Sequence, residues 1–347
     1  MSHHLTPLLL VPAALAVCLC ANPLPVYADD PGLASLKGGY VRPLERKPEN
    51  PALVALGRQL FWDTRVSASG KTACVSCHLP SLAWGAMEAK SRNDSGKLTS
   101  RKSPGLIGIG HLASGAPNGW DGRNATLEAQ IKSSIVGGSM SMKETATPVR
   151  VEVIERRIAA IPEYAARFEK ALPRQPIDVD VIATAIAAYE RTFEPGPSAF
   201  DRWVAGEETA ISDEAKHGFA LFNGKAGCAA CHSGWRLTDD NFHDIGTSRT
   251  DRGRGRELTS DPAMQFAFKT PTLRSIALHP PYMHDGSFAT LEDVIRHYET
   301  GGIERESRSP LLAPISISDE ERGDLVEFLQ TLTGEPEGDT APALPAE

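Results

Sequence analysis

Two short motifs in this chain place cysteine and histidine at the same spacing. The pattern is Cys-x-x-Cys-His, and its residues are Cys74, Cys77 and His78 in the first motif and Cys228, Cys231 and His232 in the second. In such a motif the two sulfur atoms form thioether bonds to a c-type haem, and the histidine binds its iron. A zinc site or a redox dithiol is the alternative, but a histidine directly after both cysteine pairs favours haem. The sequence therefore predicts two covalently bound haems that carry out electron transfer, peroxide chemistry or both.

The N-terminal residues have the pattern of a secretory signal peptide. An apolar run from Leu8 to Cys20 is followed by Val-Tyr-Ala at positions 26–28, with small residues where a signal peptidase recognises them. The segment departs from the usual pattern because it carries no Lys or Arg. We expect residues 1–28 to be removed and the mature protein to be periplasmic. No stable membrane span is expected, since the run is shorter than the roughly 20 residues that a span needs; a retained anchor is the alternative.

The composition narrows the classes of partner. The chain has 347 residues with 36 Lys and Arg against 44 Asp and Glu, which gives a formal net charge of −8. Nucleic-acid binding rests on neutralising phosphates with positive charge, so no nucleic-acid partner is expected. Of the six cysteines, Cys18 and Cys20 fall in the predicted signal peptide and the other four in the motifs. The mature chain therefore has no cysteine left for a structural disulfide.

The chain contains an internal repeat. Residues 120–131 and 284–295 are identical at seven of twelve positions, at an offset of 164. Lys102-Ser-Pro likewise parallels Lys269-Thr-Pro ahead of these segments. Similarity at a fixed offset indicates a duplicated structural unit. We therefore expect two tandem c-type cytochrome domains related by duplication.

The elements expected around the motifs are helices. Residues 150–171 and 179–192 have helical patterns, and another helix follows a capping box formed by Ser318 and Glu321. Extended strand patterns are not evident. The predicted fold is therefore all-α, with few or no strands.

The predicted domain boundaries follow from the motifs and the repeat. An N-terminal, peroxidatic haem domain is expected at residues 29–205 and a C-terminal, electron-transfer haem domain at residues 206–334. The remaining residues 335–347 are acidic and rich in Pro and Ala. Such a composition is typical of a disordered tail.

The helices that follow the repeated segments differ at one position. Thr126 and Thr290 are the expected caps of these helices. In the second copy Tyr298 lies on the apolar face, whereas its counterpart at offset 164 is Ser134. A phenol can reach a haem iron and a short hydroxyl cannot easily do so, which predicts one six-coordinate haem and one haem open to peroxide. An ordinary buried tyrosine is the alternative, and other candidates for the sixth ligand are Met264, His279, Met283, His284 and His297.

Several segments together resemble the bacterial dihaem cytochrome c peroxidase and MauG family. Besides the two haem motifs, they are Trp120-Asp-Gly-Arg, Lys269-Thr-Pro-Thr-Leu-Arg and Pro281-Tyr-Met-His-Asp-Gly. The likeness extends over about residues 45–335. This resemblance implies that the N-terminal haem is the peroxide site and that the C-terminal haem stores electrons. It also implies that Trp120 lies between the two haems.

Two features of the resemblance favour the MauG-like branch of the family. Counting from His-Asp-Gly, Tyr298 stands where MauG-like enzymes have a tyrosine ligand and the peroxidases a methionine. The loop of residues 91–101 contains no His, whereas the peroxidases carry one there that blocks the peroxide haem until reduction. A phenolate stabilises ferric iron and higher oxidation states, while a thioether favours ferrous iron.

Two positions depart from the family pattern. The distal Glu that serves the family as acid–base catalyst is replaced by Met140 or Ser139, so another group must move the proton during O–O cleavage. Gln130 matches a distal glutamine, which can form hydrogen bonds but cannot act as an acid. The Asn that binds an inter-haem calcium ion is Lys102 here, and an ammonium is a donor rather than a metal ligand. Calcium binding is therefore doubtful, and the lysine charge can substitute for it.

The function predicted from these features is that of a periplasmic MauG-like oxidase. It uses hydrogen peroxide to form a high-valent dihaem state, which oxidises a Trp or Tyr residue of a partner protein by long-range electron transfer. Trp120 and Gln130 are the candidate catalytic residues, and His78, His232 and Tyr298 are the candidate iron ligands. One alternative is a cytochrome c peroxidase that takes electrons from a small cytochrome or cupredoxin. Another is a non-catalytic dihaem electron carrier with both irons six-coordinate.

Overall fold

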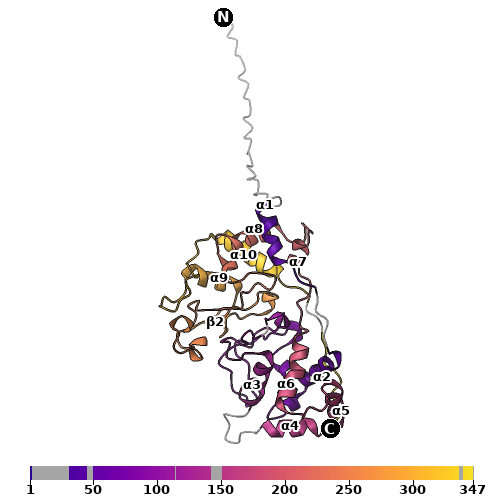
Figure 1. The fold of residues 1–347 in the computed structure, drawn as a ribbon. Coiled ribbons are helices and arrows are strands. Elements are labelled where there is room, and N and C mark those ends of the chain that lie inside the picture. The colour runs from indigo at the N-terminus through magenta and orange to yellow at the C-terminus, as the bar shows by residue number, and fades with distance from the viewer. Residues whose placement is uncertain (2–30, 45–49, 114, 142–150, 336–338, 347) are drawn as a thin grey trace.

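The computed structural model describes residues 1, 31–44, 50–113, 115–141, 151–335 and 339–346 (Figure 1). The predicted signal peptide, apart from Met1, lies outside the described residues. Among those that are described, no helix has both the length and the apolar character needed to cross a membrane. Their strands, β1 (Phe242–His243) and β2 (Phe268–Lys269), form one short antiparallel pair. The prediction of an all-α fold with few strands is confirmed.

Five helices form the lower part of the molecule in Figure 1. They are α2 (Pro51–Trp62), α3 (Leu127–Val136), α4 (Val151–Ala159), α5 (Pro162–Ala171) and α6 (Val179–Glu190). Helix α2 begins after Asn50, whose side chain accepts a hydrogen bond of 3.0 Å from the Leu53 amide. A Cβ atom on Gly57 would lie 1.8 Å from the carbonyl oxygen of Ala185. Only glycine therefore lets α2 and α6 cross at this distance.

A second group of helices forms the upper part in Figure 1. It consists of α1 (Pro31–Lys37), α7 (Ala199–Val204), α8 (Asp213–Asn223), α9 (Leu291–Thr300) and α10 (Asp319–Thr331). The predicted capping box starts α10, since Ser318 and Glu321 each accept the other's backbone N–H. A Cβ atom on Gly218 would lie 2.0 Å from the Asp324 carbonyl oxygen. The pair α8 and α10 therefore repeats the close crossing of α2 and α6.

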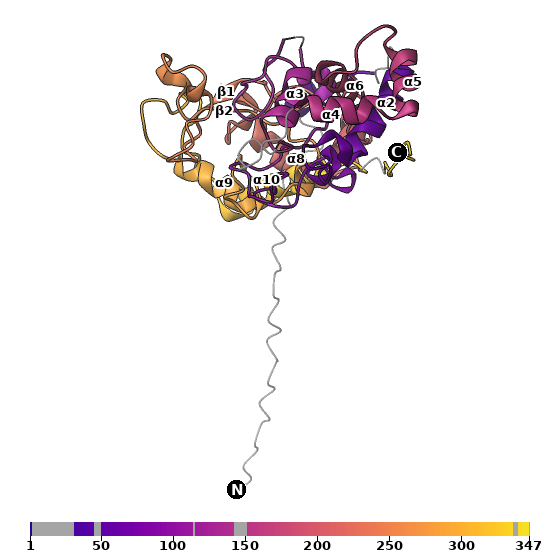
Figure 2. The ribbon, with the colours of Figure 1, turned by 90° about the horizontal axis from the view of Figure 1, so that it is seen from below.

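The buried apolar side chains form two clusters that correspond to these groups. The first cluster runs from Leu56 to Phe193. The second runs from Phe200 to Leu332 and also takes in Leu33 and Tyr40, so the N-terminal residues pack on the second group of helices. We refer to residues 50–193 as the first half and to residues 199–335 as the second half. Figure 2 shows both from below, with the strands at the end remote from α5.

The region predicted as one helix over residues 150–171 contains two helices. Helix α4 ends at Ala159 and α5 begins at Pro162. Proline has no backbone N–H to donate, and it disfavours helical geometry in the residue before it. Pro162 is therefore the start of a new helix and cannot lie in the middle of a longer one.

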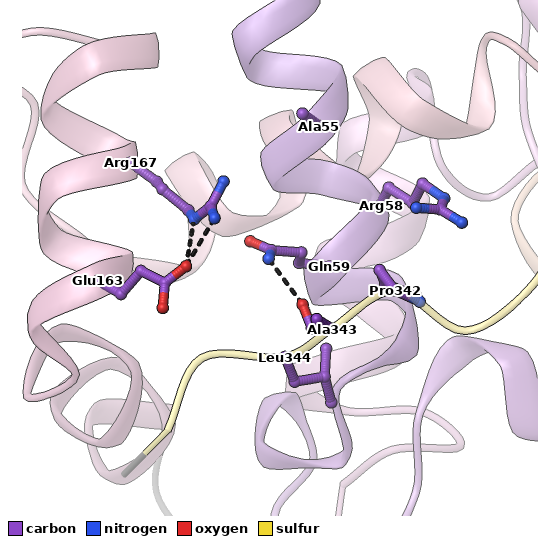
Figure 3. Close-up of a pocket in the computed structure, with 8 residues that line it drawn as sticks. All are labelled: Ala55, Arg58, Gln59, Glu163, Arg167, Pro342, Ala343 and Leu344. Carbon is purple, nitrogen blue, oxygen red and sulfur yellow. Dashed lines mark hydrogen bonds and ion pairs between the residues drawn. The ribbon is translucent and has the colours of Figure 1, made fainter.

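The tail predicted to be disordered instead lies against α2 over residues 339–346. Arg58 Nε donates to Asp339 at 3.0 Å, and Gln59 Nε2 donates to the carbonyl of Ala343 at 2.9 Å. Side chains of α2 thus satisfy polar groups of the tail, which composition alone does not reveal. Figure 3 shows the shallow pocket that results, lined by Ala55, Arg58, Gln59, Glu163, Arg167, Pro342, Ala343 and Leu344. None of these residues belongs to a haem motif.

Candidate dihaem site

Both Cys-x-x-Cys-His motifs form the same turn after equivalent helices. Residues 74–76 follow α2 and residues 228–230 follow α8, each as a single 3-10 turn. In each motif the histidine amide donates to the carbonyl of the first cysteine, at 3.0 Å in the first motif and 2.9 Å in the second. None of these four cysteines is paired in a disulfide. The duplicated motifs therefore share one local backbone geometry.

The environment of the four thiols suits thioether bonds better than metal binding. Burial raises the pKa of Cys228 to about 12 and the pKa of Cys231 to about 11. It raises the thiol pKa of Cys74 and Cys77 as well. Zinc binds the thiolate form, which these sites disfavour. A thioether sulfur carries no charge, so the cysteines fit haem attachment.

Each motif histidine is oriented to leave one ring nitrogen for iron. His78 Nδ1 donates to the carbonyl of Trp84 at 3.1 Å, and His232 Nδ1 donates to the carbonyl of Leu237 at 2.9 Å. Burial lowers the pKa of both imidazoles, which keeps them neutral. With the proton held on Nδ1, the lone pair of Nε2 is available for the metal. The two histidines therefore fit the role of proximal haem ligands.

The repeated segments hold the two halves together by a reciprocal pair of hydrogen bonds. The amide of Lys102 donates to the carbonyl of His284, and the amide of Lys269 donates to the carbonyl of Trp120, both at 2.8 Å. In the sequence repeat Lys102 corresponds to Lys269 and Trp120 to His284. Each half thus offers the same donor and the same acceptor to the other. This exchange indicates an approximate two-fold relation between the halves at their junction.

Trp120 lies at this junction. Its indole Nε1 donates to the carbonyl of Lys102 at 2.8 Å. Its ring lies edge-on to that of its counterpart His284, with 6.4 Å between the ring centroids. His284 in turn stacks on Phe268 with 3.7 Å between centroids. The indole therefore stands where the two halves meet, and its place between the two haems stays a prediction.

The position that distinguishes the two pockets lies on α3 and α9. Tyr298 is partly buried, and burial together with the nearby sulfur atoms of Cys228 and Cys231 raises the pKa of its phenol. The phenol therefore lies near the two sulfur atoms of the second haem motif. Its counterpart Ser134 donates its hydroxyl to the carbonyl of Gln130 on its own helix, at 3.1 Å. The phenol therefore lies near the sulfur atoms of its haem motif, while its counterpart is a short hydroxyl bonded to its own helix.

Two competing candidates for the sixth ligand use their Nε2 atoms elsewhere. His279 Nε2 donates to the carbonyl of Leu82 at 2.9 Å. His297 Nε2 donates to the carbonyl of Ile245 at 2.7 Å. His284 stacks on Phe268 at the junction between the halves. Met264, Met283 and His284 stay open as candidates, while the electrostatic interaction with Cys228 and Cys231 favours Tyr298.

The side chain of Gln130 forms a hydrogen bond with the loop that precedes its helix. Its Oε1 accepts a hydrogen bond of 2.8 Å from Asn124 Nδ2. Met140, which with Ser139 is one of the two residues that can stand at the position of the missing glutamate, is 5 % exposed and belongs to the first apolar cluster. The catalytic role of Gln130 therefore stays a prediction, and Met140 supplies no group that could move a proton.

Sequence reasoning missed a buried carboxyl group near the first haem motif. Glu190 at the end of α6 is 5 % exposed, close enough to Cys74 to raise the pKa of that thiol. Burial raises the pKa of Glu190 itself to about 8. The residues that meet the crossing glycines are Ala185 in the first half and Asp324 in the second. Five positions after them the first half has Glu190 and the second half has Leu329. An acid at a position where the other half has leucine is the signal that the repeat could have provided.

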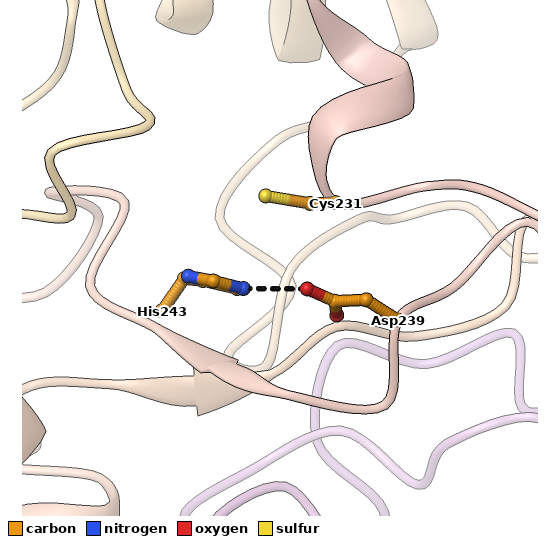
Figure 4. A group of neighbouring side chains, drawn as sticks. All are labelled: Cys231, Asp239 and His243. Carbon is orange, nitrogen blue, oxygen red and sulfur yellow. Dashed lines mark hydrogen bonds and ion pairs between the residues drawn. The ribbon is translucent and has the colours of Figure 1, made fainter.

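Cys231, Asp239 and His243 lie close enough together to hold a metal ion (Figure 4). His243 Nε2 donates a hydrogen bond of 2.8 Å to Asp239. Burial alone would raise the pKa of the Asp239 carboxyl, but the hydrogen bonds that this carboxyl accepts, including the one from His243, lower its pKa overall. The sulfur of Cys231, however, belongs to the second haem motif. A sulfur bound to haem as a thioether is no longer a thiolate ligand. The group therefore forms the surroundings of the second haem site.

The calcium site that the family implies does not fit this chain. Lys102 Nζ donates to the carbonyls of Ala86, Glu88 and Pro280, the last two at 3.3 and 3.4 Å. A calcium ion binds oxygen atoms of this kind. Here an ammonium group already occupies the point at which they converge.

The comparisons with known proteins agree with this geometry. Residues 51–209 match the family "Di-haem cytochrome c peroxidase" and residues 215–333 match "Cytochrome c". The chain is 42 % identical to the methylamine utilization protein MauG of Methylorubrum extorquens, over 96 % of this chain and 94 % of that protein. It is 33 % identical to the cytochrome c551 peroxidase of Nitrosomonas europaea, over 86 % of this chain and 85 % of that protein.

A solved structure shows the same fold. It is described as a MauG-like protein associated with microbial copper homeostasis, and it aligns with a TM-score of 0.74 at 30 % identity, over 85 % of this chain and 94 % of that one. The protein studied here therefore carries two covalent haem c groups and is a haem-dependent oxidoreductase that uses peroxide. It belongs to the dihaem cytochrome c peroxidase and MauG family.

Proposed function

We propose that this protein is a periplasmic, MauG-like oxidase that modifies a partner protein. The bound haems would supply the peroxide chemistry: the first half would hold the haem that faces peroxide, and the second half the haem that shares the oxidising equivalents. A Trp or Tyr residue of the partner is then oxidised by long-range electron transfer. The observation that supports this proposal is the buried phenol of Tyr298 near the sulfur atoms of Cys228 and Cys231, where the repeat has the short hydroxyl of Ser134 in the first half.

The residues of the chain have distinct parts in this proposal. The bound haems supply the peroxide and redox chemistry. His78 and His232, held neutral by burial and oriented through Nδ1, each present Nε2 to an iron. Tyr298 would offer the second iron a phenol oxygen, a ligand that would favour the oxidised states of that iron. Ser134, bonded to its own helix, leaves the corresponding side of the first pocket open to peroxide.

Trp120 is the proposed connection between the two pockets. Its indole is fixed by the hydrogen bond to the Lys102 carbonyl and by its edge-on contact with His284. An aromatic ring between two redox centres can act as a relay, which divides one long electron transfer into two shorter ones. The place of Trp120 at the junction therefore supports electron transfer between the haems. Gln130, on the helix that carries Ser134, is the proposed hydrogen-bonding group near the peroxide.

The second candidate function is that of a cytochrome c peroxidase, in which a small cytochrome or cupredoxin supplies the electrons. The 33 % identity to the cytochrome c551 peroxidase of Nitrosomonas europaea favours it. The two functions differ in whether the first haem reacts before any electron has been added. The third alternative, a pure electron carrier, has no open coordination position and should show no high-spin signal in ferric EPR.

A stopped-flow experiment decides between the two enzymes. The fully ferric protein is mixed with one equivalent of hydrogen peroxide, and the same mixture is prepared after addition of one electron. The proposal expects an immediate and long-lived spectral change in the fully ferric protein. A reaction only in the one-electron-reduced protein would identify a reductively activated peroxidase and would overturn the proposal.

A further inference from the structure

The side chain of Lys102 is a buried cation at the junction of the two halves. The residue is 6 % exposed, although lysine is among the residues least often found inside proteins. Its ammonium donates to the carbonyls of Ala86 and Glu88 in the first half and of Pro280 in the second. Every hydrogen bond recorded for this ammonium among the described residues goes to a backbone carbonyl. The group therefore links the two halves without an acidic side chain.

Such a cluster of carbonyl oxygens forms a binding site for a cation. Unpaired burial of a charge costs several kcal/mol, so a buried ammonium needs hydrogen-bond acceptors around it. Carbonyl oxygens from separate segments, directed at one point, are also the ligands that a hard metal ion takes. Burial lowers the pKa of Lys102 to about 8, so the side chain is still mainly protonated at neutral pH. The site thus holds a positive charge that belongs to the chain itself.

The counterpart of Lys102 in the repeat is held differently. Lys269 Nζ donates to one carbonyl, that of Pro117, at 2.9 Å and lies 3.3 Å from a carboxylate oxygen of Asp240. The Lys269 ammonium therefore forms an ion pair with Asp240 and one hydrogen bond to a carbonyl. The carbonyl cluster is therefore a property of the Lys102 position and not of lysine at this point of the repeat.

We propose that Lys102 is a tethered cation, which replaces a metal ion between the two haem domains and makes the junction independent of calcium. The backbone of the same residue also fixes contacts at the junction, because its carbonyl accepts a hydrogen bond from the Trp120 indole and its amide donates one to the His284 carbonyl. Lys102 thus supplies the buried positive charge and also anchors both the junction and the indole of Trp120. This inference goes beyond the proposed function and does not depend on which substrate is oxidised.

The first test measures calcium in the wild-type holoprotein. The protein is dialysed against calcium and then against calcium-free buffer, and its metal content is determined by atomic emission. We expect substoichiometric calcium and a melting temperature that neither EGTA nor added calcium changes. Stoichiometric calcium, or a melting temperature that EGTA lowers, would overturn the proposal without any need for a variant.

The second test exposes the carbonyl cluster to an external ion. In Lys102→Asn the ammonium is replaced by an amide oxygen, whereas Lys102→Met keeps the length of the side chain without a charge or a hard ligand. We expect both variants to melt below the wild type in EGTA. Calcium at millimolar concentration should raise the melting temperature of Lys102→Asn by about 5 °C through binding to the folded state, and should leave Lys102→Met unchanged.

Lys269→Asn is the matched control, since it removes the corresponding lysine of the repeat. It should show no rise in melting temperature with calcium. If Lys102→Asn keeps its haem spectrum but gains nothing from calcium, or if Lys269→Asn gains as much, the carbonyl cluster is not a cation site and the proposal fails.

Discussion

The two halves of this protein have the same backbone plan and different chemistry. In both, a helix ends in a Cys-x-x-Cys-His turn, and a carbonyl fixes Nδ1 of the motif histidine. A glycine allows the close helix crossing in each. The side chains that differ are Trp120, Ser134 and Glu190 in the first half and their counterparts His284, Tyr298 and Leu329 in the second.

This difference shows which features of a duplicated fold can diverge. The reciprocal bonds between Lys102 and His284 and between Lys269 and Trp120 use backbone atoms alone. They do not depend on the side chains involved, so substitutions can change the haem pockets without separating the halves. A symmetric framework can therefore hold two haems with unlike surroundings.

The largest effect is expected from removing one haem at a time. The double variant Cys74→Ala, Cys77→Ala should bind one haem instead of two and lose the reaction with peroxide altogether. The double variant Cys228→Ala, Cys231→Ala should also bind one haem but keep a reaction at the first half. Haem content from the pyridine haemochrome spectrum and the stopped-flow reaction check this. Equal loss of the peroxide reaction in both variants would show that the halves are not specialised as proposed.

The next effect concerns the ligand that separates the two pockets. Tyr298→Met should raise the midpoint potential of the second haem by on the order of 100 mV, because a thioether favours ferrous iron where a phenolate favours ferric iron. Spectroelectrochemical titration measures this change. Ser134→Ala is the matched control in the first half and should leave both potentials unchanged. An unaltered spectrum of the second haem in Tyr298→Met would show that the tyrosine is not its ligand.

A smaller effect is expected at the junction. Trp120→Phe removes the indole and its hydrogen bond to Lys102, and should slow electron exchange between the haems by at least about tenfold, equivalent to about 1.4 kcal/mol of barrier. Stability should fall by only about 1 kcal/mol. Exchange is followed optically after rapid one-electron reduction. His284→Phe should leave the rate unchanged, because imidazole is much harder to oxidise than indole, and equal slowing in both variants would contradict a special role of Trp120.

The smallest effect on the haem chemistry is expected at Glu190, which instead affects stability as a function of pH. The pKa of Glu190 is raised from the ordinary 4.5 to about 8, so between these values the folded chain holds a proton that the unfolded chain has released. The free energy of unfolding should therefore fall as pH rises from about 4.5 to about 8, by up to about 5 kcal/mol. Glu190→Leu, which gives the first half the residue of the second, should flatten this part of the curve. Denaturant titrations at several pH values measure it, and an identical pH profile for the variant would show that Glu190 ionises freely.

The helical fold and the haem attachments were predictable because their signals are local. A Cys-x-x-Cys-His motif contains its own attachment chemistry, and Ser318 with Glu321 marks a helix start within four residues. The pairing of Tyr298 with Ser134 was predictable because the repeat supplies an internal comparison. The break at Pro162 was also available from local rules, although the apolar pattern on both sides of it suggested one continuous helix.

By itself, the sequence determined the haem chemistry, the helical class and the duplication, since covalent motifs and helix periodicity depend on residues close together in the chain. Tertiary structure alone decided the reciprocal bonds at the junction, the carbonyls around Lys102, the place of Glu190 beside Cys74 and the docking of the tail on α2. Each of these joins groups that lie far apart in the chain. Backbone carbonyls, moreover, carry no residue-specific signal, so their convergence on a cation appears only when the chain has folded.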